Sequence, residues 1–421
     1  MLNIAKVRSH FPALSQNDHG VPATFFDAPS GTQVPDVVIN RMMNYLKSGV
    51  AGTKGIYKTA LKTDVLVENT RKTIQSFLNA YSKNEICFGQ NMTSLTFAFS
   101  RTLANTWSPG DEIIVTDLDH EANISPWKMA AKEKAVDVYT WHFETEACTL
   151  NIETLAKLLT PKTKLLAITA ASNINGSMPE LKEIIELAHQ NNTLVFVDAT
   201  QLMAHQSIDV QELDCDFLVC SAYKFYGPHI GILYGKRIYM DNLSPYRIAG
   251  VISECPSSWE TGTQNYEAMA GLEGAMHYLA SISENEQVTS TSLKETMQTI
   301  SEYELRLKQY FLSRLESFDQ IKVYGFNQPE NSVNRTPTFA LSFKGYSAME
   351  IATILNDNGF FAHYGHFNAP RFIERFKLQA QGGVVRIGFA HYNTLEEIEY
   401  LISTFEAIYM SEKTTVSMAM A

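Results

Sequence analysis

Two apolar runs of this chain lead into an aspartate and a lysine, and this arrangement constrains the fold most. Residues 194–197 form a run that stops at Asp198, and the run 217–220 is followed closely by Lys224. Runs of this length between polar residues are typical of strands buried on both faces. Open α/β sheets bind ligands beyond the carboxyl ends of their strands. We therefore expect Asp198 and Lys224 to lie together at a ligand site.

This pair of residue types suits the chemistry of pyridoxal phosphate. Aspartate and lysine are rarely buried without a partner, so each alone is better explained by an ordinary ion pair. Together they supply a lysine that forms a Schiff base with the cofactor aldehyde and a carboxylate that pairs with the pyridinium nitrogen. Gln201, soon after Asp198, is placed to hydrogen-bond the phenolic oxygen of the ring.

The segments VDATQ (197–201) and LDCDFLVCSAYKFYGPHIGILYGK (213–236) resemble the cofactor-lysine region of class V aminotransferases, most of all the cysteine desulfurase and selenocysteine lyase branch. The resemblance extends over nearly the whole chain. It implies a pyridoxal-phosphate enzyme of fold type I, with a large domain whose mostly parallel, seven-stranded sheet lies between helices and a small C-terminal α/β domain. It also implies a homodimer, with Ser221 and Tyr223 at the cofactor beside Lys224.

The alternation of strand and helix patterns supports that architecture. It predicts a mostly parallel sheet with helices on both faces. The expected elements include strands at 86–88, 113–116, 136–139 and 164–168 and helices at 64–80, 152–159, 181–190, 267–279 and 284–315. The predicted organisation is an N-terminal arm (1–20), a large cofactor domain (21–282), a small domain (283–410) on which the N-terminal segment packs, and a disordered tail (411–421).

Composition excludes several classes of partner. The formal net charge of −11 argues against nucleic acid or an anionic membrane surface. The chain has no apolar run long enough to span a membrane and no pattern of a secretory signal, so we expect a cytoplasmic protein. Its five scattered cysteines are typical of buried free thiols in a reducing compartment. Their spacing to histidines predicts no metal site.

A strand-to-helix turn is the predicted phosphate site. The strand 86–88 leads through Gly89 into Asn91-Met92, and free main-chain N–H groups at such a helix start bind anions. Ordinary capping by Asn91 explains the same pattern. The resemblance favours the phosphate. It also indicates that one hydroxyl contact is lost, because Asn91-Met92 stands where the family usually has threonine.

Two more residues are assigned to the cofactor by the resemblance. A lone histidine near a helix start is more often a capping residue, but His120 resembles the family histidine that stacks on the pyridine ring and moves protons. Thr263 lies in WETGTQN (259–265), which resembles a segment that reaches the phosphate of the neighbouring subunit. Capping of the next helix by Thr263 is the alternative.

Arg386 is the predicted ligand of the substrate carboxylate. It lies in an apolar, strand-like run, and a buried guanidinium needs an anion that its planar fork can bind. A salt bridge to a protein carboxylate is the alternative, and the resemblance favours the substrate. The resemblance also places four residues near the substrate or its entrance: Ala28, Thr32, Tyr57 and Asn173.

One loop departs from the family pattern. The segment YGHFNAP (364–370) resembles the loop that carries the persulfide-forming cysteine of the desulfurases, but Asn368 occupies the cysteine position. The resemblance places His366 and Asn368 at the substrate. An amide cannot attack sulfur as a thiolate does. We therefore expect no transfer of sulfur through this loop.

The expected reaction is C–S lyase-type β-elimination on a small amino acid, namely cysteine or a cysteine derivative. Lys224 would remove the α-proton while the cofactor holds the resulting charge. Transamination or epimerisation at Cα shares this first step and stays an alternative. A catalytically silent scaffold is a third hypothesis. The intact set of cofactor and substrate residues argues against it: Lys224, Asp198, Gln201, His120 and Arg386.

Overall fold

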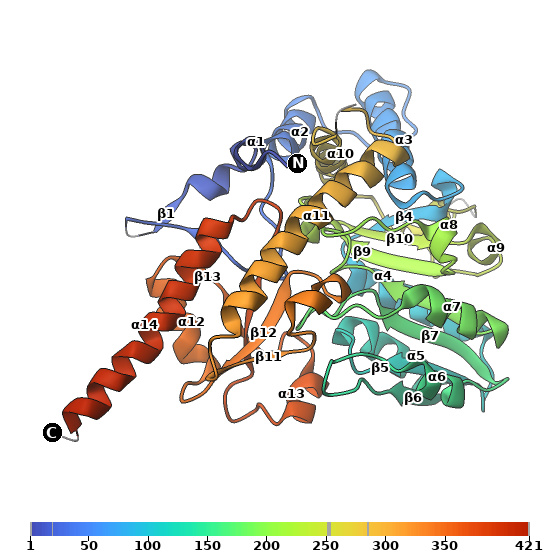
Figure 1. Cartoon of the computed structure of the whole chain (residues 1–421). Coiled ribbons are helices and arrows are strands. Elements are labelled where there is room, and N and C mark those ends of the chain that lie inside the picture. The colour runs from blue at the N-terminus through green and yellow to red at the C-terminus, as the bar shows by residue number, and fades with distance from the viewer. Residues whose placement is uncertain (1, 19, 251–253, 284–285, 420–421) are drawn as a thin grey trace.

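The protein is described by a computed structural model that places residues 2–18, 20–250, 254–283 and 286–419. The chain forms a large and a small α/β unit, and each is built around its own sheet. The long helix α11 (Ser290–Leu315) runs from one unit to the other (Figure 1). This architecture confirms the predicted fold class.

Seven strands form the large sheet, in the order β4-β10-β9-β8-β7-β5-β6. Neighbouring strands are parallel except at β10, which is antiparallel to both β4 and β9. The carboxyl ends of β4, β8 and β9 therefore meet at one edge. The strands are β4 (Ile86–Gly89), β5 (Glu112–Thr116), β6 (Asp137–Trp141), β7 (Thr163–Thr169), β8 (Leu194–Asp198), β9 (Phe217–Ser221) and β10 (Gly231–Gly235).

Alternate residues of the central strands enter two separate cores. In β8, Val195 and Val197 belong to one core, whereas Phe196 belongs to the other and contacts Trp127 with ring centroids 4.9 Å apart. Strands buried on both faces read as continuous apolar runs, which explains their detection from the sequence. The helices of this unit are α2 (Asp36–Lys47), α3 (Lys58–Leu78), α4 (Met92–Leu103), α5 (Ser125–Lys134), α6 (Ile152–Leu158), α7 (Leu181–Gln190), α8 (Val210–Leu213), α9 (Arg237–Met240) and α10 (Tyr266–Ala280).

The small unit is built on an antiparallel sheet in the order β11-β12-β15-β14. The N-terminal helix α1 (Ile4–Ser9) packs against this unit, where Arg8 pairs with Glu397 at 2.7 Å. A parallel pair, β3 (Thr24–Phe25) with β13 (Phe360–Phe361), joins the two units. The remaining elements are β1 (Asn17–Asp18), β2 (Val21–Pro22), β11 (Ile321–Tyr324), β12 (Thr338–Phe343), β14 (His363–Gly365), β15 (Val384–Gly388), α12 (Ala348–Asp357), α13 (Pro370–Phe376) and α14 (Leu395–Ala419).

Two helix boundaries differ from the prediction, and the alternative role of Thr263 as a helix cap is not found. Helix α11 begins at Ser290 rather than near residue 284, because Thr289 forms a capping box there. Helix α10 is capped by Asn265, whose side chain accepts from the Ala268 N–H, and not by Thr263. Helix α14 continues to Ala419, into the range predicted to be disordered, because no proline or glycine interrupts residues 410–419. Residues 420–421 lie outside the described part, and the domain limits stay a prediction.

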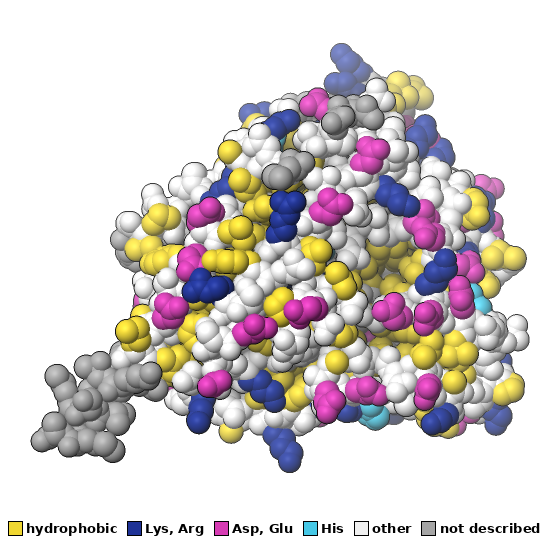
Figure 2. Space-filling model, in the orientation of Figure 1, with side chains coloured by type: hydrophobic (Ala, Val, Ile, Leu, Met, Phe, Trp, Pro, Cys, Tyr) yellow, Lys and Arg dark blue, Asp and Glu magenta, His cyan; other side chains and the backbone are white. Residues whose placement is uncertain are grey.

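The surface and the thiols agree with the composition. Acidic and basic side chains are interspersed on the face shown in Figure 2. All five cysteines are buried and free, as predicted. No helix in the described ranges has both the length and the apolar character needed to cross a membrane.

Candidate active site

A cavity of about 410 Å³ lies where the carboxyl edge of the large sheet meets the small unit. It brings together eight of the predicted site residues: His120, Asn173, Gln201, Tyr223, Lys224, His366, Asn368 and Arg386. Five further residues complete the lining: Ser30, His363, Tyr364, Gly365 and Phe367. Residues distant in the sequence thus form one polar pocket.

Lys224 presents its amine to this cavity from the turn that follows β9. Its Nζ donates hydrogen bonds to the carbonyl oxygens of Pro29 and Ser30, the latter at 2.9 Å. Burial, and next the charge of Arg386, lower the pKa of Lys224 to about 7. A large fraction of the amine is therefore neutral, and able to act as a nucleophile or base, near neutral pH.

Asp198 ends β8 as a buried carboxylate. Its Oδ1 accepts from the Thr200 N–H at 2.9 Å, while burial raises its pKa. Asp119 lies nearby and accepts hydrogen bonds from Thr116 Oγ1 and, at 2.6 Å, from Asn123 Nδ2. Burial, together with the charge of Asp198, raises the pKa of Asp119 to about 8. Asp119 is therefore largely protonated at neutral pH.

His120 lies in the loop after β5 and lines the same cavity. Its Nδ1 accepts from the Ala122 N–H at 3.0 Å, so the proton of the neutral ring is on Nε2. Burial, then the charges of Lys224 and Arg386, lower the pKa of His120 to about 4. The imidazole is neutral at physiological pH and has one N–H to offer. His120 thus both caps a helical turn, as the alternative had it, and lines the pocket.

Arg386 reaches the cavity from β15 of the small unit. It donates to the Asn173 carbonyl oxygen at 2.9 Å, to Asp27 Oδ1 at 3.3 Å and to Ser30 Oγ. Its Nε is buried and without a partner in the described structure. Asp27 is therefore a protein carboxylate that pairs with Arg386, as the alternative to substrate binding proposed. One donor of the guanidinium nevertheless stays unsatisfied.

The loop that follows β14 closes the pocket. Phe367 and Asn368 are both left-handed, with φ of 51° and 52°. The Phe367 carbonyl oxygen accepts from Asn173 Nδ2 at 2.6 Å, and the Asn368 carbonyl oxygen accepts from the Glu121 N–H at 2.8 Å. Asparagine is among the residues that adopt this conformation most readily. The main chain of Asn368 is thereby fixed at the cavity, and its side chain is exposed there.

The predicted phosphate turn lies beside the end of β9. The Met92 N–H donates to Ser221 Oγ at 2.9 Å, and Asn91 Oδ1 caps α4 by accepting from the Ser94 N–H at 2.9 Å. A Cβ atom on Gly231 would lie 2.5 Å from the Asn91 carbonyl carbon, so only glycine allows the turn to approach this closely. The side chain of Asn91 acts as an ordinary cap, and the assignment of the turn to a phosphate stays a prediction.

Eight predicted residues are absent from the described lining of the cavity. Four of them, Asp198, Ser221, Asn91 and Met92, lie in the neighbouring strand ends and the turn described above, and the other four lie elsewhere. Ala28 and Thr32 are buried behind it, and Thr32 Oγ1 accepts from the Tyr226 N–H at 2.7 Å. Ser30, in the same loop, lines the pocket in their place, because it is the residue of this turn that faces Lys224. Tyr57 and Thr263 are exposed at the surface of the described chain.

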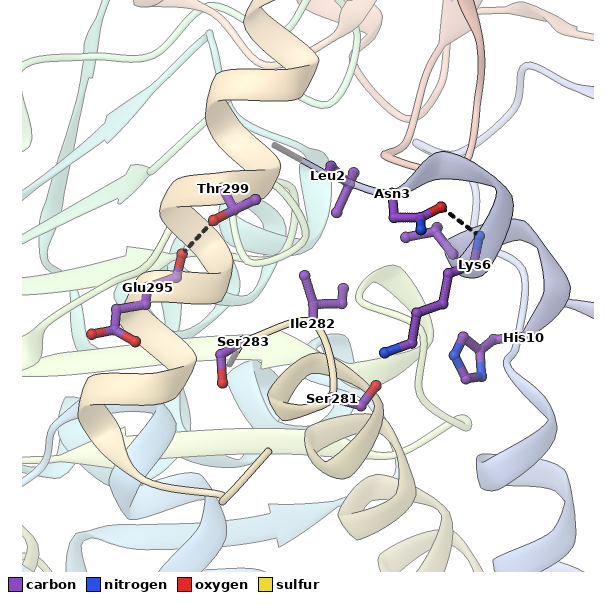
Figure 3. Close-up of a pocket in the computed structure, with 10 residues that line it drawn as sticks. Leu2, Asn3, Lys6, His10, Ser281, Ile282, Ser283, Glu295 and Thr299 are labelled. Carbon is purple, nitrogen blue, oxygen red and sulfur yellow. Dashed lines mark hydrogen bonds between the residues drawn. The ribbon is translucent and has the colours of Figure 1, made fainter. Parts of the chain in front are cut away.

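A second cavity, of about 320 Å³, lies between α1 and the end of α10 (Figure 3). Lys6 and His10 line one side, and Ser281 and Glu295 line the other. None of the predicted site residues lies here. Its polar side chains are at least partly exposed, so we assign the chemistry to the Lys224 cavity.

The sequence model of the family "Aminotransferase class-V" matches residues 24–401. The chain belongs to this family. Its class-V relatives include the cysteine desulfurases of Escherichia coli K12 and Shigella flexneri, each 32% identical to this chain. Both alignments cover 97% of this chain, and they cover 99% of the Escherichia coli protein and 98% of the Shigella protein.

Solved structures agree with this membership. The cysteine desulfurase CsdA from Escherichia coli, solved as its S-sulfonic acid, has a TM-score of 0.82 at 25% identity and covers 97% of this chain and 98% of its own. The apo cysteine desulfurase from Thermococcus onnurineus has a TM-score of 0.86 at 23% identity, with the same coverage. This class-V protein is therefore a pyridoxal-phosphate enzyme of fold type I that resembles cysteine desulfurases.

The residues around Lys224 fit the cofactor of the class-V family. The Lys224 amine and the His120 imidazole line one cavity, and the buried carboxyl group of Asp198 lies close enough to Lys224 to affect its pKa. Two buried polar atoms near this cavity, Asn173 Oδ1 and Thr200 Oγ1, have no partner among the described residues. Unpaired buried polar groups are costly, and a bound polar ligand would satisfy them.

Among the residues of this class-V site that the sequence did not single out, Ser30, Asp119 and Phe367 contact or lie near its charged groups. Ser30 and Asp119 each lie within two residues of a predicted one, so their loops had been found but their side chains had not been distinguished. Phe367 had no signal of its own. It lies in the loop identified through Asn368, and only the structure places its ring against Arg386.

Proposed function

We propose that this class-V enzyme catalyses β-elimination on cysteine or a cysteine derivative, without forming a persulfide on the protein. The sulfur would leave directly as sulfide, and the carbon skeleton would leave as pyruvate. The observation that carries the proposal is the identity of residue 368, an asparagine rather than a cysteine among the residues that line the cavity.

The positions of the thiols support this reaction. No cysteine is among the described residues that line the cavity. Burial raises the pKa of Cys87, Cys148, Cys215 and Cys220, with Cys148 at about 12. Sulfur transfer needs a thiolate, which such thiols rarely form near neutral pH.

Lys224 is the proposed base. When bound, pyridoxal phosphate supplies the electron sink for charge that develops at Cα. With its amine free, Lys224 would take the proton from Cα of the substrate. The electron pair of that bond then forms a bond between Cα and Cβ as the bond from Cβ to sulfur breaks. With one water molecule, L-cysteine is converted into pyruvate, ammonia and hydrogen sulfide.

Arg386 and His120 are the proposed orienting groups. The Arg386 guanidinium is held by Asn173 and Ser30, and it binds the substrate carboxylate in place of Asp27. His120 offers its Nε2–H at the cavity. A neutral ring keeps the proton available for a developing negative charge and adds no further positive charge beside Lys224.

Product analysis tests this proposal. Purified enzyme is incubated with L-cysteine, and pyruvate, alanine and sulfide are quantified with and without a dithiol. The proposal predicts equal amounts of pyruvate and sulfide, little alanine and no stimulation by the dithiol. Alanine as the main product, with sulfide release that depends on the dithiol, would contradict it.

We also propose that the enzyme is a homodimer. Exposed apolar side chains recur at helical spacing on two successive helices, Ile39, Met43 and Leu46 on α2 and Leu61 and Val65 on α3. Stripes of this kind are typical of interfaces. Tyr57 lies just before α3, and both Tyr57 and Thr263 are exposed, so each can contact the partner copy. The family resemblance assigns Thr263 to the phosphate bound in that copy.

A further inference from the structure

A buried polar network lies behind the Lys224 cavity. The ring of His391 is hydrogen-bonded at both nitrogens, by Nδ1 to the Tyr226 hydroxyl at 2.8 Å and by Nε2 to the Tyr278 hydroxyl. His391, Tyr226 and Tyr278 are each at most 1% exposed. The Phe11 ring packs edge-on against Tyr278, with centroids 5.1 Å apart. The described lining of the cavity includes none of these side chains.

The hydrogen bonds fix the position of every proton in this network. Tyr226 donates its hydroxyl proton to the Ala204 carbonyl oxygen at 3.1 Å, so its oxygen must accept from His391 Nδ1–H. His391 Nε2 is then the acceptor, and Tyr278 donates to it. Burial, and next His205, lower the pKa of His391 to about 3. The ring is therefore neutral, with one defined tautomer that ties the two tyrosines together.

Tyr226 transmits this restraint to Lys224. Its φ is 67°, an uncommon conformation for an aromatic residue that persists only where the surroundings enforce it. Its N–H donates to Thr32 Oγ1, and its hydroxyl is held by Ala204 and His391. Since Lys224 lies in the same short turn, the backbone that orients its amine depends on these anchors.

His391 is itself firmly attached to the strand that carries Arg386. It lies in the segment directly after β15. On one side of it the Phe389 N–H donates to the Pro337 carbonyl oxygen at 2.9 Å, and on the other the Tyr392 hydroxyl accepts from the Gln33 N–H at 3.3 Å. A displacement of the His391 ring therefore cannot be absorbed by a loose loop.

We propose that His391 is a positioning residue, which fixes the separation of the Lys224 amine and the Arg386 guanidinium by tying the lysine turn to the β15 strand. These two groups come from different sheets, so their separation depends on contacts between the large and small units. Ser30 bridges them at the front of the pocket, and the His391 network does so from behind. The proposal rests on Lys224 as the cofactor lysine but not on the fate of the substrate.

The charges at Lys224 make this separation measurable. Arg386 lowers the pKa of the amine, whereas Asp27 and Asp198 raise it. His120 is neutral at physiological pH. Near His391, the ionisable side chains that act on the network, apart from its tyrosines, are His205 and Glu304, which are hydrogen-bonded to each other at 2.8 Å. If the network is cut, the Ser30 bridge alone ties the two groups together, so Arg386 lies farther from Lys224 on average and the proton affinity at the lysine nitrogen rises.

The test titrates the visible absorbance of the cofactor-loaded full-length enzyme with pH, in the absence of any substrate. Tyr226→Phe and His391→Leu each remove the link to the lysine turn, whereas His391→Gln retains one donor and one acceptor. Tyr324→Phe is the matched control, because it deletes a tyrosine hydroxyl that bonds Ser342 at 3.1 Å in the small unit. Circular dichroism verifies that each variant is folded.

We expect the midpoint of the titration to rise by about 0.5 to 1 pH unit in Tyr226→Phe and His391→Leu. It should return toward the wild-type value in His391→Gln and stay unchanged in Tyr324→Phe. Folded Tyr226→Phe with the wild-type midpoint would overturn the proposal, even if His391→Leu failed to fold. An equal shift in Tyr324→Phe would also overturn it, since general loosening would then explain the effect.

Discussion

The guanidinium carbon of Arg386 lies 3.9 Å from the centroid of the Phe367 ring. The ring covers one face of the guanidinium, so the edge of the fork is left for hydrogen bonds with a carboxylate. Phe367 is itself fixed through its carbonyl oxygen by Asn173. The loop that bears Asn368 and the arginine proposed to bind substrate are therefore parts of one packed arrangement.

Phe367→Leu should weaken substrate binding. The loss of a cation–π contact of about 0.5 to 2 kcal/mol corresponds to a rise in KM of roughly 2- to 30-fold, with a smaller change in kcat. Phe376→Leu is the matched control, because that aromatic residue is also partly buried but packs against Tyr324 and Phe143 away from the pocket. Steady-state kinetics with L-cysteine check this, and equal KM changes in both variants would contradict it.

Lys224→Ala should abolish covalent attachment of the cofactor. Borohydride reduction of the wild type should fix pyridoxal phosphate on the peptide that contains Lys224, because its nucleophilic amine lies in the cavity. Lys236→Ala is the control, since that lysine pairs with Asp216 at 3.0 Å in the same stretch of chain. Peptide mapping by mass spectrometry decides, and label on any other lysine refutes the assignment.

The cofactor-free protein should gain stability from Lys224→Met, and the gain should shrink as pH rises. Burial and Arg386 lower the pKa of Lys224 from 10.5 to about 7. Between these values the unfolded chain binds a proton that the folded chain does not, so wild-type stability rises with pH in this window. The free energy of unfolding of the wild type should rise by at most about 1.4 kcal/mol per pH unit, and partial exposure of the Lys224 side chain reduces this slope.

Urea denaturation of the wild type and Lys224→Met at pH 7, 8 and 9 measures this effect. The difference in the free energy of unfolding should be largest at pH 7 and smallest at pH 9. A difference that is constant over this range would mean that the Lys224 pKa is not depressed in the folded protein.

The apolar stripe on α2 and α3 predicts a dimer that charge can disrupt. Leu46 and Leu61 are 51% and 53% exposed, and a glutamate at either position would place a charge in the proposed interface. Leu46→Glu and Leu61→Glu should shift the protein toward monomer in light scattering. Ile238→Glu, at a site 67% exposed on α9, should leave the dimer intact. A wild-type monomer that binds cofactor tightly would contradict the interface.

The elements that could be predicted from the sequence are those that repeat a simple physical pattern. Strands β8 and β9 are buried on both faces and therefore appear as continuous apolar runs that end at Asp198 and Ser221. Helix starts were less certain. Asn265 and Thr263 are both capping types and lie two residues apart, and the path of the preceding loop places Asn265 at the cap.

The parts of the site that escaped prediction are contacts between segments distant in the sequence. Ser30 gained its place because its carbonyl oxygen accepts from Lys224 and its hydroxyl from Arg386. Neither contact gives rise to a periodic pattern in the sequence. Likewise, Asp117 and Asp119 are both buried and differ only in their partners: Asp117 pairs with Arg375 at 3.0 Å, whereas Asp119 lies near Asp198 and has a raised pKa.

The central claim is that this enzyme releases sulfur without holding it on a cysteine. Intact-mass spectrometry of the cysteine-treated enzyme under non-reducing conditions tests it most directly. Asn368→Cys serves as the positive control, because it places a thiol at the cavity wall. The account predicts an unchanged mass for the wild type and a gain of one sulfur atom for Asn368→Cys. A gain of one sulfur atom in the wild type, mapped to one of its five cysteines and coupled to alanine formation, would contradict it.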